Sequence, residues 1–355
     1  MRDSIHLLLR HQAPSGAFPA CPTFSQYPYA WLRDSSFVAY ALDRAGEHAA
    51  ARYHRWAAGV IARLEPRIAA LIAKRAAEPI GECEFPPTRF ALSGEALGDD
   101  WPNFQFDGYG QWLWGLGEHL KFQGIDQLPP EFEPGARVTL KFLGTFWNEP
   151  CFDCWEEFLY RWHASTLASL YGGVKAMGRF LSEEQGLAER VRAFTLGHNV
   201  AGGALAKFAG FPVSDASLLW AAVPFGLLDV TDPVFQRTLA HIEADLVQGG
   251  VHRYAFDTSC GGGAWVLLSA WLGWVYARLG REEDAARMLA WVRAQDDGGG
   301  LPEQTASSTL NPAYAAYWRE RWGESARPLL WSHAMHVVLE SELASQPTLS
   351  KAETA

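Results

Sequence analysis

The segments WVLLSAWLGWVYARL, residues 265–279, and EEDAARMLAWVRA, residues 282–294, decide the fold of this 355-residue chain. The first is apolar on nearly every helical face, whereas the second carries charge on one side and Met288, Leu289 and Trp291 on the other. A helix that is apolar all round is buried, and a helix with one apolar face is half buried. The pair therefore predicts an inner and an outer layer of helices.

Apolar residues recur at three- and four-residue spacing from one end of the chain to the other, which is typical of helices. The spacing predicts helices over Ser36 to Ala45, Glu47 to Lys74 with a break near Pro66, Tyr109 to Phe122, Glu157 to Phe180, Gly186 to Gly197, Pro233 to Val247, Ala264 to Leu279, Glu282 to Ala294 and Pro328 to Leu343. Weaker candidates are Ile5 to His11, Ser217 to Ala222 and Ala313 to Trp322. An all-α fold with six inner and six outer helices fits this total of about twelve. We expect one small β-hairpin over Arg137 to Trp147, where β-branched and aromatic residues alternate.

Charge and hydropathy exclude several classes of protein. The chain has 30 Lys and Arg against 40 Asp and Glu, a formal net charge of −10, and lacks the basic face that binds phosphates. No segment approaches the roughly 18 to 20 uninterrupted apolar residues that span a bilayer, and the N-terminus lacks the apolar run of a secretion signal. We therefore expect a soluble, cytoplasmic protein with no nucleic-acid or membrane partner.

The cysteines Cys21, Cys83, Cys151, Cys154 and Cys260 are odd in number and irregular in spacing, which argues against a disulfide framework. Cys151 and Cys154 form a CxxC pair, a spacing shared by zinc knuckles and redox motifs, but no second CxxC follows. Inert thiols are the favoured interpretation, with metal or redox chemistry as the alternative. We expect no metal and no cofactor.

The chain contains 16 Trp, and six segments are rich in acidic, basic, hydroxylated or Trp residues; five of the six join a Trp to a charged or hydroxylated neighbour. These segments are YAWLRDSS (29–36), DDWPNFQFDGYGQW (99–112), FDCWEEF (152–158), HRYAFDTSCGGGAW (252–265), GGGLPEQ (298–304) and LLWSHA (329–334). A pyranose ring stacks its C–H face on an indole while carboxylates and guanidinium groups bind its hydroxyls. The segments therefore indicate a sugar-binding site.

Two carboxylates in separate segments suggest the reaction. Glycoside hydrolysis needs one acid that protonates the leaving oxygen and one carboxylate that attacks the sugar or activates water. Glu156 follows the apolar Trp155 and precedes Glu157, and both neighbours are expected to raise its pKa, as a general acid requires. Glu303 follows Pro302 and a glycine run, and is expected to stay ionised and hold a water. The alternative is that the paired Glu residues only mark a helix N-terminus.

Taken in order, these segments resemble glycoside hydrolase family 15, the family of glucoamylases, glucodextranases, isomaltose glucohydrolases and one group of trehalases. The resemblance rests on YAWLRDS from Tyr29, W-x-x-x-Q-x-D-G at Trp101 to Gly108, WEE at Trp155 to Glu157, RY-x-x-D and GG-x-W between Arg253 and Trp265, PEQ at Pro302 to Gln304, and WS at Trp331 and Ser332. Each motif alone is weak, but all six in the family's order cover nearly the whole chain.

The resemblance implies an (α/α)6 barrel, with a pocket where the inner helices end and an inverting mechanism. It makes Glu156 the general acid and Glu303 the general base. Arg33, Asp34 and Arg253 are implied to bind the outer hydroxyls of the non-reducing glucose in subsite −1, and Glu157 to face the leaving sugar. The implied walls of the pocket are Trp31, Trp101, Trp155 and Trp265, although any of these could be plain core.

The layout also suggests the substrate. We expect residues 1–345 to form a single catalytic domain and residues 346–355 a frayed tail, a layout that resembles compact single-domain relatives acting on isomaltose. Small α-1,6-linked glucosides are the first expectation, followed by α-1,4 maltooligosaccharides and trehalose. The segment from Gln304 to Trp322 is expected to help form the wall of subsite +1, with Tyr314, Tyr317 and Trp318 as candidate contacts.

Two other classes remain open from the sequence. One is a sugar-binding barrel that has lost its activity, although Glu156 and Glu303 are both present in their motifs. The other is an epimerase or polysaccharide lyase on the same barrel, which would rely on His or Tyr as a base. The oligomeric state is not predicted.

Overall fold

A computed structural model describes residues 1–345 of the chain, and the tail predicted over 346–355 lies outside the described residues. The α-helices are α1 (Arg2–Arg10), α2 (Leu32–Arg44), α3 (Ala49–Ala62), α4 (Glu65–Arg75), α5 (Asp107–Phe122), α6 (Glu133–Phe146), α7 (Ala164–Met177), α8 (Leu187–His198), α9 (Pro233–Leu246), α10 (Val266–Arg278), α11 (Glu282–Arg293), α12 (Pro312–Trp322) and α13 (Leu330–Ser345). Three short 3-10 helices are η1 (Glu82–Glu84), η2 (Ala216–Ala221) and η3 (Ser259–Gly261).

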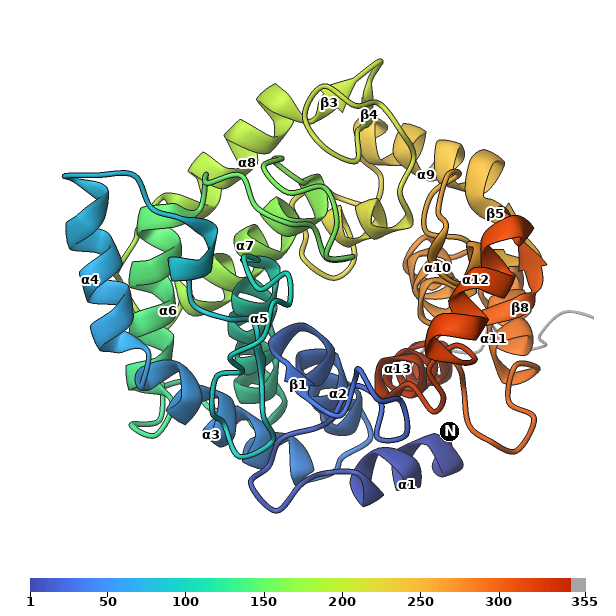
Figure 1. The fold of residues 1–355 in the computed structure, drawn as a ribbon, viewed down its shortest axis with the longest axis horizontal. Coiled ribbons are helices and arrows are strands. Elements are labelled where there is room, and N and C mark those ends of the chain that lie inside the picture. Colours follow the sequence, from blue (N-terminus) through green and yellow to red (C-terminus); the bar gives the residue numbers. More distant parts are fainter. Residues whose placement is uncertain (346–355) are drawn as a thin grey trace, which may run out of the picture.

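The helices form two concentric rings, an (α/α)6 barrel (Figure 1). The inner ring runs α2, α5, α7, η2, α10 and α13, each element packing on the next and α13 closing against α2. Around it lie α3, α6, α8, α9, α11 and α1, each packed on an inner element. The two layers predicted from the sequence are confirmed, with a short 3-10 helix in the fourth inner place.

The pair of segments that predicted the layers occupies one inner and one outer position. In α10 every side chain from Val266 to Ala277 is buried, whereas α11 buries only Ala285, Leu289 and Val292. Full burial of a large apolar side chain contributes about 1.5–3 kcal/mol. The burial of the inner ring is therefore a main source of the barrel's stability.

Aromatic side chains fill the middle of the barrel. Trp220 lies 5.1 Å from Trp271 between ring centroids, and Phe37 lies 4.7 Å from Trp271 and 5.7 Å from Trp331. The first three are fully buried, and Trp331 is 3% exposed. These rings therefore close the interior and leave a pocket at one end, above Trp331.

The strands are short and antiparallel. They are β1 (Ala30–Trp31) with β2 (Arg89–Phe90), β3 (Val200–Ala201) with β4 (Ala204–Leu205), and β5 (Val247–Gln248), β6 (Gly250–Val251), β7 (Gly263–Trp265) and β8 (Gln304–Thr309) in one sheet. Strand β1 leads directly into α2, β7 leads into α10, and Trp265 pairs with Gln304. The strands therefore fix several pocket segments at the N-terminal ends of inner helices.

Two sequence predictions about local structure are wrong. The hairpin expected over Arg137 to Trp147 is part of α6, because Pro134 in the first turn starts a helix and the buried positions recur with helical spacing. The helix expected from Glu157 begins only at Ala164, because residues 157–163 form a loop. The other predicted helices agree with the structure to within a few residues, apart from Ser217 to Ala222, which lies in η2.

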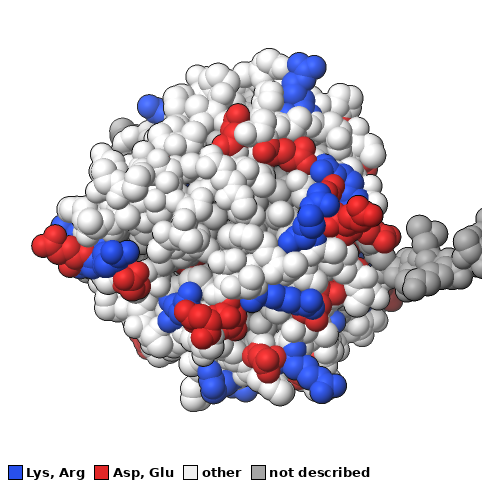
Figure 2. Space-filling model, turned by 90° about the vertical axis from the view of Figure 1, so that its right-hand side faces the viewer, with Lys and Arg blue, Asp and Glu red and all other residues white. Residues whose placement is uncertain are grey.

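The surface carries no concentrated basic field on the face seen in Figure 2, where basic and acidic side chains lie interspersed. Within residues 1–345, none of the helices combines the length and the apolar character that crossing a membrane requires.

Candidate active site

A cavity of about 390 Å³ opens where β1, β7 and the N-terminal ends of α2 and α10 meet. It brings together the residues that the resemblance implied as catalytic groups, sugar-binding groups and aromatic walls. Its lining includes Trp31, Arg33, Asp34, Trp101, Trp155, Glu156, Glu157, Arg253, Trp265 and Glu303. Carboxylates, guanidinium groups and indoles therefore share one concave site, although their segments are far apart in the sequence.

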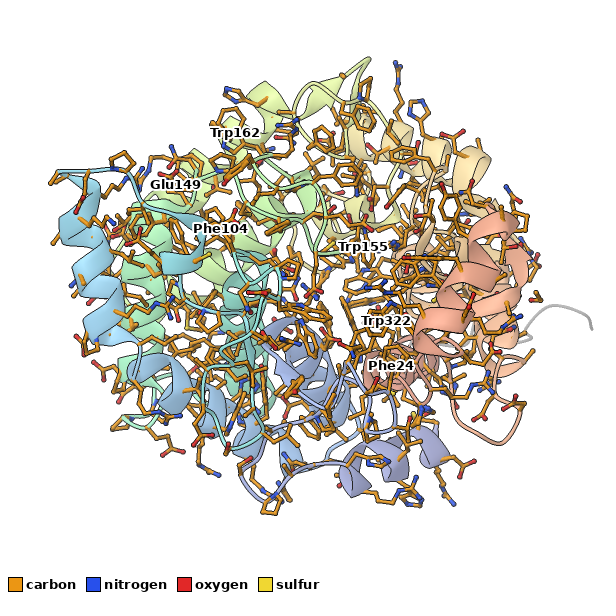
Figure 3. The ribbon with its side chains drawn as sticks, in the orientation of Figure 1. Phe24, Phe104, Glu149, Trp155, Trp162 and Trp322 are labelled. Carbon is orange, nitrogen blue, oxygen red and sulfur yellow. The ribbon has the colours of Figure 1, made fainter. Side chains whose placement is uncertain are left out.

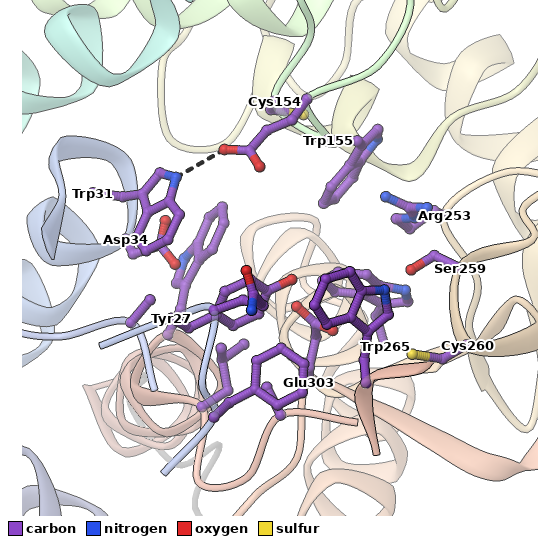
Figure 4. A pocket seen from close by; sticks show the side chains of 18 of the residues that line it. Tyr27, Trp31, Asp34, Cys154, Trp155, Arg253, Ser259, Cys260, Trp265 and Glu303 are labelled. Atoms are coloured by element: carbon purple, nitrogen blue, oxygen red, sulfur yellow. Dashed lines mark hydrogen bonds between the residues drawn. The ribbon is translucent and has the colours of Figure 1, made fainter. Parts of the chain in front are cut away.

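Glu156 projects into the cavity from the loop before α7. Its Oε1 accepts a hydrogen bond from Trp31 Nε1 at 2.8 Å, drawn dashed in Figure 4, and another from Gln105 Nε2 at 3.2 Å. Arg33 Nη2 lies 3.6 Å from the same oxygen. The two donors thus hold Oε1, which leaves Oε2 as the oxygen that can carry a proton.

Glu303 immediately precedes β8 and is only 7% exposed. Burial raises the pKa of Glu303 to about 7, with Arg253 opposing the rise and Asp34 adding to it, and Tyr27 forms a hydrogen bond with the carboxylate. In Figure 4, Glu303 and Trp31, the partner of Glu156, flank the opening from different sides. The glycine run does not leave Glu303 with little bulk around it, because the pocket wall encloses the carboxylate and burial raises its pKa.

Arg33 and Asp34 lie in the first turn of α2 rather than in a loop. Arg33 Nη1 donates to Gln105 Oε1 at 2.8 Å and lies 3.3 Å from Asp107 Oδ2. Burial raises the pKa of Asp34 to about 6, although Arg33 opposes the rise. Asp107 and Gln105 thus orient Arg33, while both Arg33 and Asp34 reach the cavity.

The guanidinium group of Arg253 forms two hydrogen bonds with the carboxylate of Asp257. Its Nε donates to Asp257 Oδ2 at 2.7 Å and its Nη2 to Asp257 Oδ1 at 2.6 Å. The same Nη2 lies 3.2 Å from Glu157 Oε1, and the Tyr254 hydroxyl donates to Glu157 Oε2. Burial raises the pKa of Glu157, against the opposing charge of Arg253. Asp257 therefore orients Arg253.

The four tryptophans predicted as walls line the cavity in two pairs. Trp31 and Trp101 meet edge to face with centroids 5.7 Å apart, and Trp155 lies 5.3 Å from Trp265. The Arg253 guanidinium lies 5.3 Å from the Trp155 ring and 5.2 Å from the Trp265 ring. Aromatic faces therefore stand beside charged groups, the combination that a pyranose ring needs.

The mouth of the cavity is formed partly by α12. Trp318 and Trp322 line it, and Phe24 faces them from the N-terminal segment; Figure 3 shows Phe24, Trp155 and Trp322 around one central opening. Of the candidates for subsite +1, Trp318 lines the cavity, whereas Tyr314 and Tyr317 are 48% and 54% exposed and do not belong to its lining.

The sequence did not predict Tyr27 and Cys260, which line the pocket, or Gln105, which lies behind it, as site residues. Tyr27 bonds to Glu303, Gln105 joins Arg33 to Glu156, and Cys260 lies in the cavity wall. Gln105 is the Q of W-x-x-x-Q-x-D-G, so its motif contained a signal. Tyr27 stands just before YAWLRDS in an aromatic run, FSQYPYAW, and nothing in that run marks one ring as a partner of Glu303.

Two of the cysteines, Cys154 and Cys260, lie in the cavity wall. Burial raises the pKa of both Cys151 and Cys154, which keeps these thiols protonated, and within residues 1–345 the cysteines are free. In the same range, the one cluster close enough to share an ion is Asp43, His54 and His119, and none of these lines the cavity. The groups that line the cavity are instead carboxylates, guanidinium groups and indoles.

Comparisons with known proteins agree with this geometry. Residues 1–191 match the model of the glycosyl hydrolases family 15. An isomaltose glucohydrolase of Kribbella flavida (strain DSM 17836 / JCM 10339 / NBRC 14399) is 41% identical, over 99% of this chain and 94% of that protein. A solved glycosidase variant in complex with glucose superposes with a TM-score of 0.92 at 41% identity, over 98% of this chain and 96% of that one.

A bacterial glucoamylase complexed with acarbose shares the fold, with a TM-score of 0.73 at 16% identity over 96% of this chain and 54% of that one. Such a low identity supports the barrel architecture alone. The match to the Kribbella protein extends over almost the full length of both chains. The chain therefore belongs to glycosyl hydrolase family 15 and is a glycoside hydrolase.

Proposed function

We propose that this glycoside hydrolase is an exo-acting α-glucosidase that releases β-glucose from the non-reducing end of small α-glucosides. The observation that carries the proposal is the pair Glu156 and Glu303, two carboxyl groups in one cavity with different surroundings. Glu156 is the general acid, because its Oε1 is held by two donors and its Oε2 is left to give a proton to the glycosidic oxygen. Glu303 is the general base that takes a proton from the attacking water.

The environment of Glu303 suits this role. A general base works best when its pKa lies near the operating pH, and burial places that of Glu303 at about 7. Inversion requires that the water attack the sugar face opposite the departing oxygen. The sugar itself is held by Arg33, Asp34 and Arg253 at its hydroxyls, between the indoles of the pocket.

We also propose that α-1,6-linked glucosides of the isomaltose type are the preferred substrates. The support is the isomaltose glucohydrolase that matches nearly the whole chain, together with the bulky mouth formed by Trp318, Trp322 and Phe24. Such a mouth favours short substrates over polymers. Glucose is the expected product and ligand of subsite −1, in keeping with the glucose complex of a similar glycosidase.

The test is hydrolysis of isomaltose, maltose, trehalose and panose, with the first product observed by proton NMR. We expect β-glucose to appear first and isomaltose to give the highest kcat/KM. Glu156→Gln and Glu303→Gln should each lower kcat by about 10²-fold or more while the protein stays folded. Initial release of α-glucose would overturn the inverting assignment, and a higher kcat/KM on maltose or trehalose would overturn the linkage assignment.

A further inference from the structure

Lys207, which follows β4, is a buried charge outside the pocket lining. Among the lysines of residues 1–345 it alone is buried, with 3% of its surface exposed. Its Nζ lies 2.9 Å from Asp153 Oδ2 and 2.5 Å from Asp215 Oδ2. A buried ammonium is retained only when its partners compensate for the lost hydration, and here two carboxylates do so.

Both partners of Lys207 hold the loop that carries Glu156. Asp153 Oδ1 accepts hydrogen bonds from the backbone N–H groups of Trp155 at 3.0 Å and Glu157 at 2.8 Å. Asp215 Oδ2 accepts from Trp155 Nε1 at 3.0 Å. One ammonium therefore connects the two carboxylates that fix the backbone on both sides of Glu156 and the indole beside it.

The loop needs such support because its backbone is strained. Glu156 has a φ of 66°, in the left-handed region that non-glycine residues rarely adopt. Conformations of this kind persist only where the surroundings fix them. The Glu156 N–H also donates to the Asp153 carbonyl at 2.9 Å, so Asp153 anchors the tight turn through both its main chain and its side chain.

We propose that Lys207 is a positioning residue of the acid-bearing loop: its ammonium keeps Asp153 and Asp215 in place, and through them it sets the direction of the Glu156 carboxyl. Lys207 does not touch the sugar. The inference rests on the proposed function in one respect, because it takes Glu156 to be the general acid.

The charge balance explains why an ammonium is needed at this position. Without Lys207, two carboxylates would share a dry site, and such a pair tends to take up a proton. Burial raises the pKa of Asp153, but Lys207, acting together with His163 and the N–H of Glu157, more than offsets burial, so the pKa of Asp153 is lowered. A protonated Asp153 is a poorer acceptor for the N–H groups of Trp155 and Glu157, so the loop would relax away from its strained conformation.

The test uses Lys207→Met and two substrates that differ in their need for an acid. The second glucose of isomaltose would leave as an alkoxide unless the general acid protonates the glycosidic oxygen. Fluoride leaves α-glucosyl fluoride with little need for a general acid. We expect Lys207→Met to lower kcat on isomaltose between about tenfold and about 100-fold, because misplacing a reacting group by about 1 Å has effects of this size. Its kcat on α-glucosyl fluoride should stay within about threefold of wild type.

Two controls separate the possible outcomes. Lys141→Met, a matched change at an exposed lysine on α6, should leave both substrates unaffected. Glu156→Gln should show the same split between substrates as Lys207→Met. If Glu156→Gln lacks the split, the proposed acid is wrong; if it shows the split and Lys207→Met slows both substrates equally or neither, Lys207 is not a positioning residue.

A charge-balanced variant keeps the test decisive if Lys207→Met does not fold. Asp215→Asn in addition to Lys207→Met removes the surplus negative charge and keeps an oxygen that can accept from Trp155 Nε1. Thermal melts followed by circular dichroism report whether each variant is folded. If Lys207→Met folds, the double variant should recover part of the activity on isomaltose. If Lys207→Met does not fold, the folded double variant should itself lose more activity on isomaltose than on α-glucosyl fluoride. Equal losses on both substrates would overturn the proposal.

Discussion

The buried carboxylate of Glu303 is expected to lower the stability of the enzyme at neutral and alkaline pH. Burial raises its pKa from an ordinary 4.5 to about 7. A tenfold change in proton affinity corresponds to about 1.4 kcal/mol, so ionising Glu303 in the folded protein costs about 3 kcal/mol more than in the unfolded chain. We therefore predict that Glu303→Gln, a neutral side chain of nearly the same shape, stabilises the protein.

The sign and the pH window follow from proton binding. Below pH 4.5 the carboxyl is protonated in both states, so the substitution should change little. Between pH 4.5 and about 7 the folded protein keeps the proton that the unfolded chain loses, so the free energy of unfolding falls as pH rises. Above pH 7 the cost is complete, and Glu303→Gln should be more stable than wild type by up to about 3 kcal/mol.

Urea-induced unfolding, followed by tryptophan fluorescence at pH 4.5, 6 and 8, measures this difference. The bond with Tyr27 survives the substitution, since the amide oxygen of Gln can still accept from a hydroxyl. Glu189→Gln on the exposed surface of α8 is the matched control and should follow the wild-type curve. A stability difference that is constant with pH, or a Glu303→Gln protein that is weaker at pH 8, would refute the reasoning.

Three further predictions concern catalysis. The plot of kcat/KM against pH should rise through a limb near pH 7, where Glu303 loses its proton; a limb below pH 5 would contradict its role as base. Arg253→Lys should raise the KM for isomaltose about tenfold, because an ammonium cannot form two hydrogen bonds to Asp257 and reach Glu157 as well. Initial-rate kinetics would measure this change, and an unchanged KM would contradict the role of Arg253 in binding the sugar. Trp318→Ala should lower kcat/KM on isomaltose by about tenfold and leave α-glucosyl fluoride, which has no second sugar, unchanged; equal losses would place Trp318 elsewhere.

The barrel could be predicted because its information is local. Helix α10 is apolar on all faces, whereas α11 is apolar on one face only. Each pattern can be read from the helix's own residues, so the periodicity of apolar residues predicts the two layers. The prediction of a hairpin over 137–147 was wrong because it also relied on local spacing. The apolar residues of this segment fit both an alternating and a helical spacing. Only the helix-starting Pro134, which the prediction overlooked, separates the two patterns.

Site residues that belong to a sequence motif could be predicted. Residues outside every motif, which only the fold brings to the site, could not. Arg33 and Asp34 lie in one motif, and both line the cavity. Lys207 and Tyr27 lie outside every motif, and their partners Asp153 and Glu303 come from distant segments. The surroundings of Glu303 depend on how several loops close over it, which no single segment encodes.

Helix α12 lies on the surface, outside the two rings of the barrel, and it affects which substrates can enter. It buries none of its own residues, yet Trp318 and Trp322 reach the mouth of the cavity. Substitutions in α12 can therefore reshape what enters without disturbing the packed barrel or the carboxylates beneath. New linkage preferences are open to evolution, and to the engineer, by exchanging this one surface helix while the catalytic machinery stays intact.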